Sequence, residues 1–221
     1  MKFSFPVFCV ASFALVACQK TVSPPDVTSS SSVKANESMS FFLTSVGPGD
    51  GANLGGLSGA DAHCSSLAIA AGSSGKEWRA YLSTNGEDGV NAKDRIGDGP
   101  WVNANGVIVA TSIDNLLDEA ANGLSKDNSI SESGEIISGR GDTPNRHDIL
   151  TGTDGNGDYT ENTCSNWTSN GEGSATVGHH DRTGGGAQPT HWSSAHGSRG
   201  CSQGNLQSSG GDGLFYCFAV N

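Results

Sequence analysis

The sequence predicts an α+β domain with a small core, long glycine-rich loops and disulfide bonds. Its 221 residues include 32 glycines and only 34% hydrophobic residues, which suits one domain with much loop and turn. Short apolar segments of both helical and strand period are spread along the chain. Four cysteines, an even number, follow an N-terminal segment typical of exported proteins, and disulfides persist in oxidising compartments.

Residues 1–17 resemble the signal peptide of a bacterial lipoprotein. One basic residue precedes an uncharged apolar run from Phe3 to Ala17, which is too short to span a bilayer comfortably. The segment Leu15-Val16-Ala17-Cys18 resembles the lipobox, in which the cysteine becomes the acylated N-terminus, carrying chains such as palmitate. We therefore expect lipidation at Cys18. The alternative is an ordinary cleaved signal with a chance cysteine.

Residues 18–38 are expected to be a flexible tether between the lipid and the domain. They are rich in Ser, Pro and Thr and nearly free of large apolar side chains, so they cannot offset the entropy of ordering. Gln19 after the lipidated cysteine resembles the sorting choice for the outer membrane of Gram-negative bacteria. The expected location is that membrane, with the domain facing either the periplasm or the cell surface.

The charge balance argues against polyanionic partners. Without residues 1–17 the chain has 11 basic and 23 acidic residues, since Lys2 is the charge it loses, and the formal charge changes from -11 to -12. Such a surface repels phosphate backbones, because no counterion release rewards the contact. Neither nucleic acid nor a heparin-like polyanion is an expected partner.

A first helix is expected from about Ser58 to Gly72. Ser58 is a suitable N-cap, and Asp61 three residues later completes a pair resembling a capping box. Gly72 is a suitable C-terminal stop. The residues of the buried face, at helical spacing, are Ala60, Cys64, Leu67, Ala68 and Ala71. Cys64 therefore points into the core.

The remaining elements are short. A second helix is expected over Asp114–Asn122, ended by Gly123. Strand-like segments occur at residues 40–46, 78–83, 106–110, 149–153, 166–169 and 214–220. In the second of these, apolar positions alternate as in a half-buried strand. Residues 122–148 and 170–213 are expected to form long irregular loops.

Two disulfides are expected among the cysteines that remain after Cys9 and Cys18 are set aside. These are Cys64, Cys164, Cys201 and Cys217, and three pairings are open. A zinc site is the alternative. It is disfavoured because no two of these cysteines have the C-x2-C spacing typical of one.

Four segments carry a family resemblance. GLSGADAHCSSLAIAAGSSGKEWRAYLST, DRIGDGPWVNANGVIVATSIDNLL, LTGTDGNGDYTENTCSNWTSNGEGSATVG and GCSQGNLQSSGGDGLFYCFAV resemble endostatin, the C-terminal domain of certain collagens, and more closely the endostatin-like domains of bacterial lipoproteins. The resemblance implies a C-type lectin-like domain over residues 39–221. It also implies nested bridges, Cys64 to Cys217 and Cys164 to Cys201, which spacing alone does not select.

Two properties of endostatin are not carried over. Its zinc site uses histidines at the extreme N-terminus, and this domain has none before His63. Its arginine-rich heparin surface is missing here as well. Sugar-binding C-type lectins also hold calcium with carboxylates that this chain lacks, since Gln188-Pro189-Thr190 and Trp192-Ser193-Ser194 stand at the corresponding places.

Three further motifs have open interpretations. Asp154, Asn156, Asp158 and Glu161 alternate like calcium ligands but lack the EF-hand glycine and final glutamate, so a weak calcium site and a solvated turn are both considered. His179, His180, Asp181, His191 and His196 could surround a transition metal or serve as buried hydrogen-bonding groups around Trp192. Gly200-Cys201-Ser202-Gln203-Gly204 matches the hydrolase elbow without its strand and helix.

The expected function is a lipid-anchored recognition or adhesion module for a protein or glycan, presented by the loops between Cys164 and Cys201. The residues expected at the contact surface are Gln188, His191, Trp192, His196 and Arg199. Arg140-Gly141-Asp142 resembles the integrin-binding tripeptide, a weak motif. A structural envelope lipoprotein without a soluble ligand is the alternative, and calcium-dependent sugar binding ranks below it. No enzyme activity and no cofactor beyond weak calcium are expected, because no nucleophile, base and orienting group can be assembled.

Overall fold

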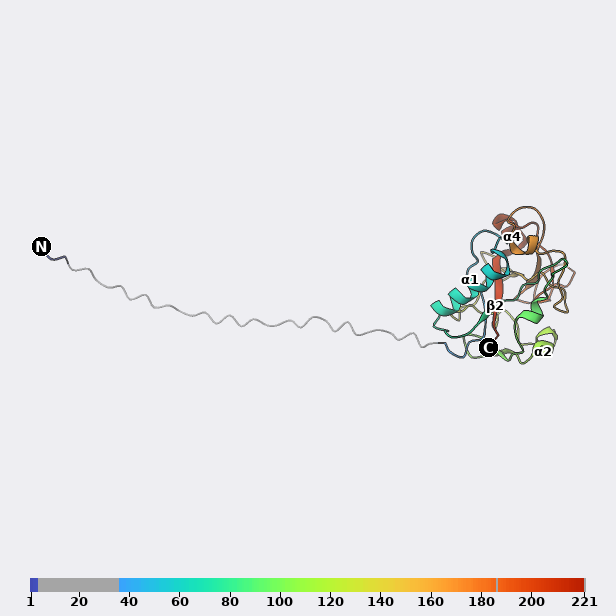
Figure 1. Cartoon of the computed structure of the whole chain (residues 1–221), viewed down its shortest axis with the longest axis horizontal. Coiled ribbons are helices and arrows are strands. Elements are labelled where there is room, and N and C mark those ends of the chain that lie inside the picture. The colour runs from blue at the N-terminus through green and yellow to red at the C-terminus, as the bar shows by residue number, and fades with distance from the viewer. Residues whose placement is uncertain (4–35, 186, 221) are drawn as a thin grey trace. The chain divides into compact units, whose positions relative to one another are not determined.

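The computed structural model describes residues 1–3, 36–185 and 187–220. Residues 36–185 and 187–220 belong to an α+β domain (Figure 1). In that domain no described helix has the length and apolar character needed to cross a bilayer. Cys18 and most of the predicted tether lie outside the described residues. Asn36 and Glu37, the end of that tether, already hydrogen-bond to the domain.

The main sheet is organised around strand β8 (Gly211–Ala219). Strands β1 (Phe41–Leu43) and β2 (Trp78–Ala80) pair antiparallel with its second half, and β5 (Asp148–Leu150) pairs parallel with its first half. Strands β6 (Thr176–His179) and β7 (His196–Gly197) extend the sheet beyond β5. Strands β3 (Trp101–Val102) and β4 (Ile108–Ala110) form a separate antiparallel pair.

Strand β8 is buried on both faces, which explains its near-continuous apolar sequence. Alternate residues enter two different clusters because strand side chains alternate between faces. Phe215 and Cys217 pack under helix α1 (Gly56–Ala70), whereas Tyr216 and Phe218 join an aromatic cluster with Trp192. In Figure 1, β8 lies between α1 on one side and α2 (Ile113–Leu117) on the other.

The start of α1 differs from the prediction. The helix begins at Gly56, and the residue before it, Gly55, has a φ of 77° and no side-chain cap. The predicted N-cap Ser58 is exposed inside the first turn. Asp61 does not complete a capping box, because its carboxylate contacts Arg79, Arg95 and the β2 backbone. The predicted buried face is confirmed, with Ala60, Cys64 and Ala68 buried and Leu67 and Ala71 partly buried.

The second helix is shorter than expected. Helix α2 ends at Leu117, and the Asn122 side chain donates to the carbonyl oxygens of Leu116 and Asp118. These bonds satisfy the last helical carbonyls, so the chain turns instead of continuing. The strand predicted at residues 166–169 is wrong. Residues Cys164–Trp167 form the short turn α3, with positive φ at each of its residues.

Tertiary contacts decide the conformation of α3. Asn166 and Thr163 bond to each other and to Asn85, and the Trp167 indole donates to the Ser83 carbonyl at 2.7 Å. The loop expected at residues 170–213 contains strands β6 and β7 and helix α4 (Gln203–Ser209). The short helix η1 (Ala92–Arg95) and strand β3 were also not predicted. Residues 122–147 form no helix or strand, as expected, and the last residue of the predicted loop, Asp148, begins β5.

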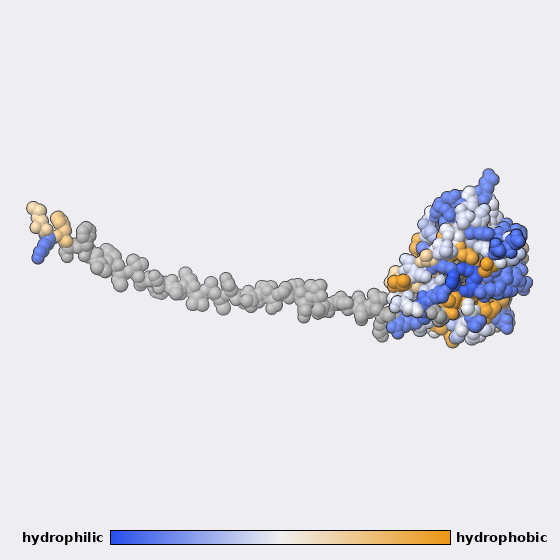
Figure 2. Space-filling view, in the orientation of Figure 1, coloured by the Kyte–Doolittle hydropathy of each residue, from blue (hydrophilic) through white to orange (hydrophobic). Residues whose placement is uncertain are grey.

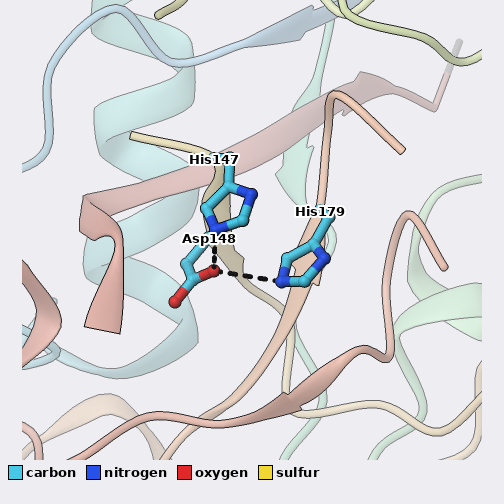
Figure 3. Close-up of side chains that lie close together, drawn as sticks. All are labelled: His147, Asp148 and His179. Atoms are coloured by element: carbon cyan, nitrogen blue, oxygen red, sulfur yellow. Dashed lines mark ion pairs between the residues drawn. The ribbon is translucent and has the colours of Figure 1, made fainter. Parts of the chain in front are cut away.

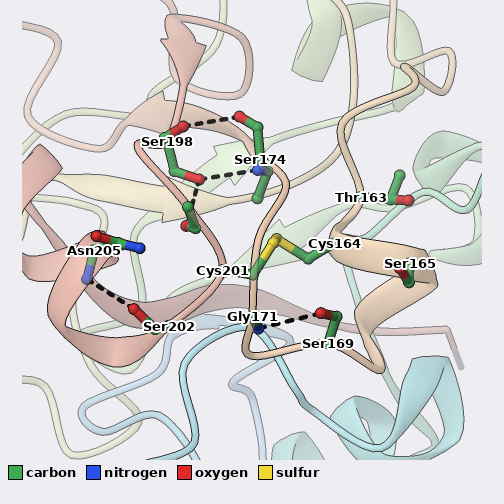
Figure 4. Close-up of a disulfide and its surroundings, with 12 residues drawn as sticks. Thr163, Cys164, Ser165, Ser169, Gly171, Ser174, Ser198, Cys201, Ser202 and Asn205 are labelled. Carbon is green, nitrogen blue, oxygen red and sulfur yellow. Dashed lines mark hydrogen bonds between the residues drawn. A yellow bond between two sulfur atoms is a disulfide. The ribbon is translucent and has the colours of Figure 1, made fainter.

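Both disulfides implied by the resemblance are present. Cys64 bonds to Cys217 across 153 positions, and Cys164 to Cys201 across 37 positions, so the second bridge is nested inside the first. The first joins α1 to β8. Figure 4 shows the second joining α3 to the turn that precedes α4, next to the segment that leads into β6.

The surface of the domain is predominantly polar. On the face shown in Figure 2, hydrophilic residues cover most of the domain, and apolar side chains occur in small separate groups. The exposed large apolar residues of the domain are Val46, Ile69, Val107, Ile108, Ile136 and Tyr159. Isolated apolar residues of this kind are normal on a protein surface.

Candidate metal centre

Three neighbouring strands bring histidines and an aspartate together. Asp148 of β5 lies directly opposite His179 of β6, and β7 pairs with β6 so that His196 reaches the same place. His147 immediately precedes β5. We call His147, Asp148, His179 and His196 the histidine–aspartate cluster. Figure 3 shows the Asp148 carboxylate between the imidazoles of His147 and His179.

One carboxylate oxygen is the focus of the cluster. Asp148 Oδ1 lies 3.1 Å from His147 Nε2, 3.2 Å from His179 Nε2 and 3.5 Å from His196 Nε2. The Nε2 atoms of His179 and His196 are 3.1 Å apart. The rings of His147 and His179 stack with their centroids 4.2 Å apart. The donor atoms of His147, Asp148 and His179 therefore share one small volume, and His196 Nε2 approaches two of them.

The outer nitrogen of each ring faces an oxygen. His179 Nδ1 lies 2.7 Å from the carbonyl oxygen of Pro189, and His196 Nδ1 lies 3.0 Å from that of Gly197. His147 Nδ1 lies 3.4 Å from Asp181 Oδ1. A carbonyl oxygen only accepts, so the contacts of His179 and His196 place a hydrogen on Nδ1. His147 Nδ1 forms no hydrogen bond of good geometry with a described residue. The Nε2 atoms of all three rings then face Asp148 Oδ1.

The cluster is largely sheltered from water. The side chains of Asp148 and His179 are 2% and 0% exposed, whereas that of His196 is 26% exposed. Burial raises the pKa of Asp148, but contact with His179 and His196 outweighs burial, and the net pKa is below its ordinary value. Contact with Asp148 in turn raises the pKa of His196. The site therefore favours positive charge beside the carboxylate.

A cavity of about 500 Å³ opens next to the cluster. His147 and His196 line it, so two of the three histidines are reached from outside. The other lining residues are Arg140, Asn145, Gly185, Gly197, Arg199 and Ser209. A second cavity of about 510 Å³ shares Asn145 and Ser209 with the first. Every side chain that lines the first cavity is polar.

The predicted transition-metal group is divided by the fold. His179 and His196 belong to the cluster, and Asp181 contacts the outer nitrogen of His147. His180 is outside the cluster: its Nε2 lies 3.3 Å from the Ser138 carbonyl oxygen, and burial lowers its pKa to about 4. His191 instead lies near Glu119, at 3.6 Å.

His147 and Asp148 were not predicted as site residues. In the sequence, the feature that could have indicated them is a pair of adjacent residues of metal-ligating type directly before the predicted strand at residues 149–153. That signal is weak by itself. The pairing of β5 with β6, which brings His179 opposite Asp148, cannot be derived from it.

The predicted contact surface is only partly at the surface. Gln188 and Arg199 are exposed and His196 is partly exposed. Trp192 is fully buried against Tyr81 and Tyr216, with centroid distances of 4.8 and 5.3 Å. His191 is also buried, and its Nδ1 accepts from the backbone N–H groups of Ser193 and Ser194. Trp192 and His191 therefore support the loop from inside and do not face solvent.

The oxygens of the predicted calcium turn have protein partners. Asp154 Oδ1 accepts from the backbone N–H groups of Asn156 and Asp158, the arrangement of an Asx turn. Asp158 pairs with Lys93 at 2.7 Å, and Glu161 accepts from the Asn85 amide at 3.0 Å. Calcium binding at this turn stays a prediction.

Ser202 of the hydrolase-like motif has a structural role. It is the N-cap of α4 and accepts from the backbone N–H of Asn205 at 3.2 Å, as Figure 4 shows. The Arg140-Gly141-Asp142 tripeptide is exposed, but Asp142 pairs with Lys126 at 2.6 Å and accepts from the Gly139 N–H. Arg140 lines the cavity instead.

Comparison with protein-family models and with curated proteins finds no match to this chain. The candidate function therefore depends on the chemistry of the cluster and the cavity.

Proposed function

We propose that this chain is a lipid-anchored recognition module of the bacterial outer membrane, with a C-type lectin-like domain of the endostatin-like kind. The mixed α+β domain and its two nested disulfides support this proposal, since an oxidising envelope is where such bonds persist. The lipobox-like segment ending at Cys18 supports the anchor. Intact mass of the mature chain tests it, because an unacylated N-terminus contradicts lipidation.

The proposal for ligand binding rests on two arginines that line the cavity. In the described domain four of six arginines pair with carboxylates: Arg79, Arg95, Arg146 and Arg182. The other two, Arg140 and Arg199, are exposed, form no ion pair with a described residue, and both line the cavity beside the cluster. In a chain of formal charge -11, unpaired cations gathered at one cavity favour an anionic ligand.

The size and the polarity of the cavity favour a small sugar acid. About 500 Å³ is within the usual range for small-molecule sites. Guanidinium groups bind carboxylates through paired hydrogen bonds, and Asn145 and Ser209 offer donors and acceptors for hydroxyl groups. We propose that the ligand is an acidic sugar at the end of a glycan, with its carboxylate toward Arg140 and Arg199.

Calorimetric titration of the purified mature chain with glucuronic acid and N-acetylneuraminic acid tests this proposal. We expect binding of at least one acid, no binding of methyl glucoside, and at least a tenfold loss of affinity in Arg199→Gln and Arg140→Gln, because each removes a charge-assisted hydrogen bond worth about 1.5–3 kcal/mol. Lys93→Gln, which removes a cation outside the cavity, is the matched control.

Two outcomes contradict the acidic-sugar proposal. If neither acid binds but a matrix-protein array gives a signal that depends on Arg199, the partner is a protein. If neither acid binds and the matrix-protein array is blank, the alternative of a structural envelope lipoprotein without a soluble ligand replaces the recognition proposal. If sugar binding depends on calcium, the turn at Asp154 replaces the arginine-lined cavity as the candidate sugar site.

A further inference from the structure

We infer that the histidine–aspartate cluster is a binding site for one divalent transition-metal ion of the Zn²⁺ class. The ligands are the Nε2 atoms of His147, His179 and His196 and Oδ1 of Asp148. This inference goes beyond the proposed sugar recognition and does not depend on it. Four properties of the cluster support a metal ion: its inward-facing donor atoms, the distances between them, its surrounding contacts and its access.

The inward-facing atoms of the cluster favour a cation. His179 and His196 donate from Nδ1 to carbonyl oxygens, and their Nε2 atoms lie 3.1 Å apart beside a buried carboxylate. Neither oxygen of Asp148 has a hydrogen-bond partner of good geometry among the described residues. Unsatisfied buried carboxylate oxygens are costly. One divalent ion between these atoms satisfies the carboxylate and the imidazoles together.

The separations between donor atoms match a metal site. Zn²⁺ binds histidine nitrogen at about 2.0–2.1 Å, so two donors on a tetrahedral ion lie about 3.3 Å apart. Asp148 Oδ1 lies 3.1, 3.2 and 3.5 Å from the three Nε2 atoms, and two of those nitrogens are 3.1 Å apart. Donor atoms of His147, Asp148 and His179 lie within 4.8 Å of one another.

Surrounding contacts hold the rings in place. Metal-bound histidines usually donate their other nitrogen to a carbonyl or a carboxylate, and here the carbonyl oxygens of Pro189 and Gly197 accept from His179 and His196. Asp181 Oδ1 lies 3.4 Å from His147 Nδ1. The backbones of two glycines pass so close to the rings that no side chain fits between them. A Cβ on Gly184 would lie 2.6 Å from His179 Cε1, and one on Gly210 would lie 3.0 Å from His147 Nε2. The site is therefore preorganised.

The donor set and access define the ion and its role. Three imidazole nitrogens and one carboxylate oxygen suit zinc, nickel, copper or iron, whereas calcium requires six to eight oxygens. Asp148 and His179 close the inner side of the site, and His147 and His196 line the cavity. The cavity side therefore gives a metal ion a route to the ligands.

Metal binding by the untagged mature chain tests the inference. The chain is treated with a chelator, desalted and titrated with Zn²⁺ by calorimetry, and Co²⁺ is added to a second sample to record visible d–d absorption. We expect one zinc per chain and Co²⁺ bands of a low-coordinate nitrogen site. His196→Gln, which alters the most exposed ligand, is expected to weaken zinc binding at least tenfold and to change the Co²⁺ spectrum.

Control variants separate this site from zinc binding at a surface histidine. His63→Gln changes a histidine on α1 outside the cluster and is expected to bind zinc like the wild type. Arg140→Gln and Arg199→Gln are expected to keep zinc while losing the acidic sugar, so failure of the sugar proposal leaves this one intact. Near-ultraviolet circular dichroism verifies that each variant is folded. Wild-type zinc binding that is absent, or is unchanged in folded His196→Gln, overturns the inference.

Discussion

The carboxylate of Asp61 links helix α1 to strand β2 and to the short helix η1. It pairs with Arg79 at 3.0 Å and with Arg95 at 2.7 Å, and its second oxygen accepts from the Ala80 N–H at 2.9 Å. Its side chain is 13% exposed and that of Arg95 is 8% exposed. Partial burial of a pair that also bonds to backbone makes these contacts worth more than an exposed surface ion pair.

Substitutions at Ser58 and Asp61 distinguish a capping role from this interaction. We expect Ser58→Ala to change the free energy of unfolding by less than about 0.5 kcal/mol, because Ser58 is exposed and caps nothing. Asp61→Ala is expected to cost about 2–3 kcal/mol, since it leaves the Arg95 guanidinium and the Ala80 N–H without this partner. Urea unfolding of the mature chain, followed by tryptophan fluorescence, measures both. Similar losses in the two variants contradict the assignment.

At the scale of elements, the neighbouring strands β5, β6 and β7 place the candidate metal site on hydrogen-bonded backbone. Asp148 and His179 are register partners, and His196 lies on the next strand. Their donor atoms therefore keep fixed spacing without depending on loop conformation. The loop after β6 contributes through Gly184, whose backbone passes close to the rings of both His147 and His179.

Substitution of Gly184 tests that close approach. Gly184 has a φ of 140° and a Cβ there would collide with His179, whereas Gly106 has a φ of 80° and open space around its Cβ position. We expect Gly184→Ala and Gly106→Ala both to lose stability, by roughly 1–3 kcal/mol, because alanine is strained at positive φ. Only Gly184→Ala is expected to weaken zinc binding, by at least about tenfold. Calorimetry with Zn²⁺ measures the difference, and equal affinities contradict the proposed close packing.

At the scale of the whole molecule, two covalent bonds hold a modest core and long loops together. The outer bridge links α1 to the central strand, and the inner bridge encloses the segment that contains His179 and His196. Cross-links stabilise mainly by limiting the unfolded chain, and the effect grows with loop length. The two bridges are therefore expected to differ in what they stabilise.

Removal of each bridge separately tests this division. Loop lengths of 153 and 37 give stabilisation of about 5 and about 4 kcal/mol in the chain-entropy account. We expect Cys64→Ala with Cys217→Ala to lower the urea midpoint more than Cys164→Ala with Cys201→Ala. The second pair is expected to weaken zinc binding as well, because its loop carries two ligands. The reverse order of urea midpoints contradicts the dependence on loop length.

The parts of the fold predicted from the sequence are those with local signals. The buried face of α1 follows from helical spacing around Cys64, and β2 and β8 follow from apolar segments of the right length. The even cysteine count predicted two disulfides, although their pairing came from a family resemblance and not from spacing. The strand assigned to residues 166–169 failed because hydrogen bonds to distant Asn85 and Ser83 override local preference there.

The sequence by itself determined an α+β domain with two disulfides and a polar, acidic exterior, because composition and short-range period depend on neighbouring residues only. The tertiary structure alone decided that Trp192 lies in the core, that Arg140 and Arg199 face one cavity, and that His147 and Asp148 meet His179 and His196. Those groups come from separate segments, and they meet only because strands β5, β6 and β7 pair across long stretches of chain.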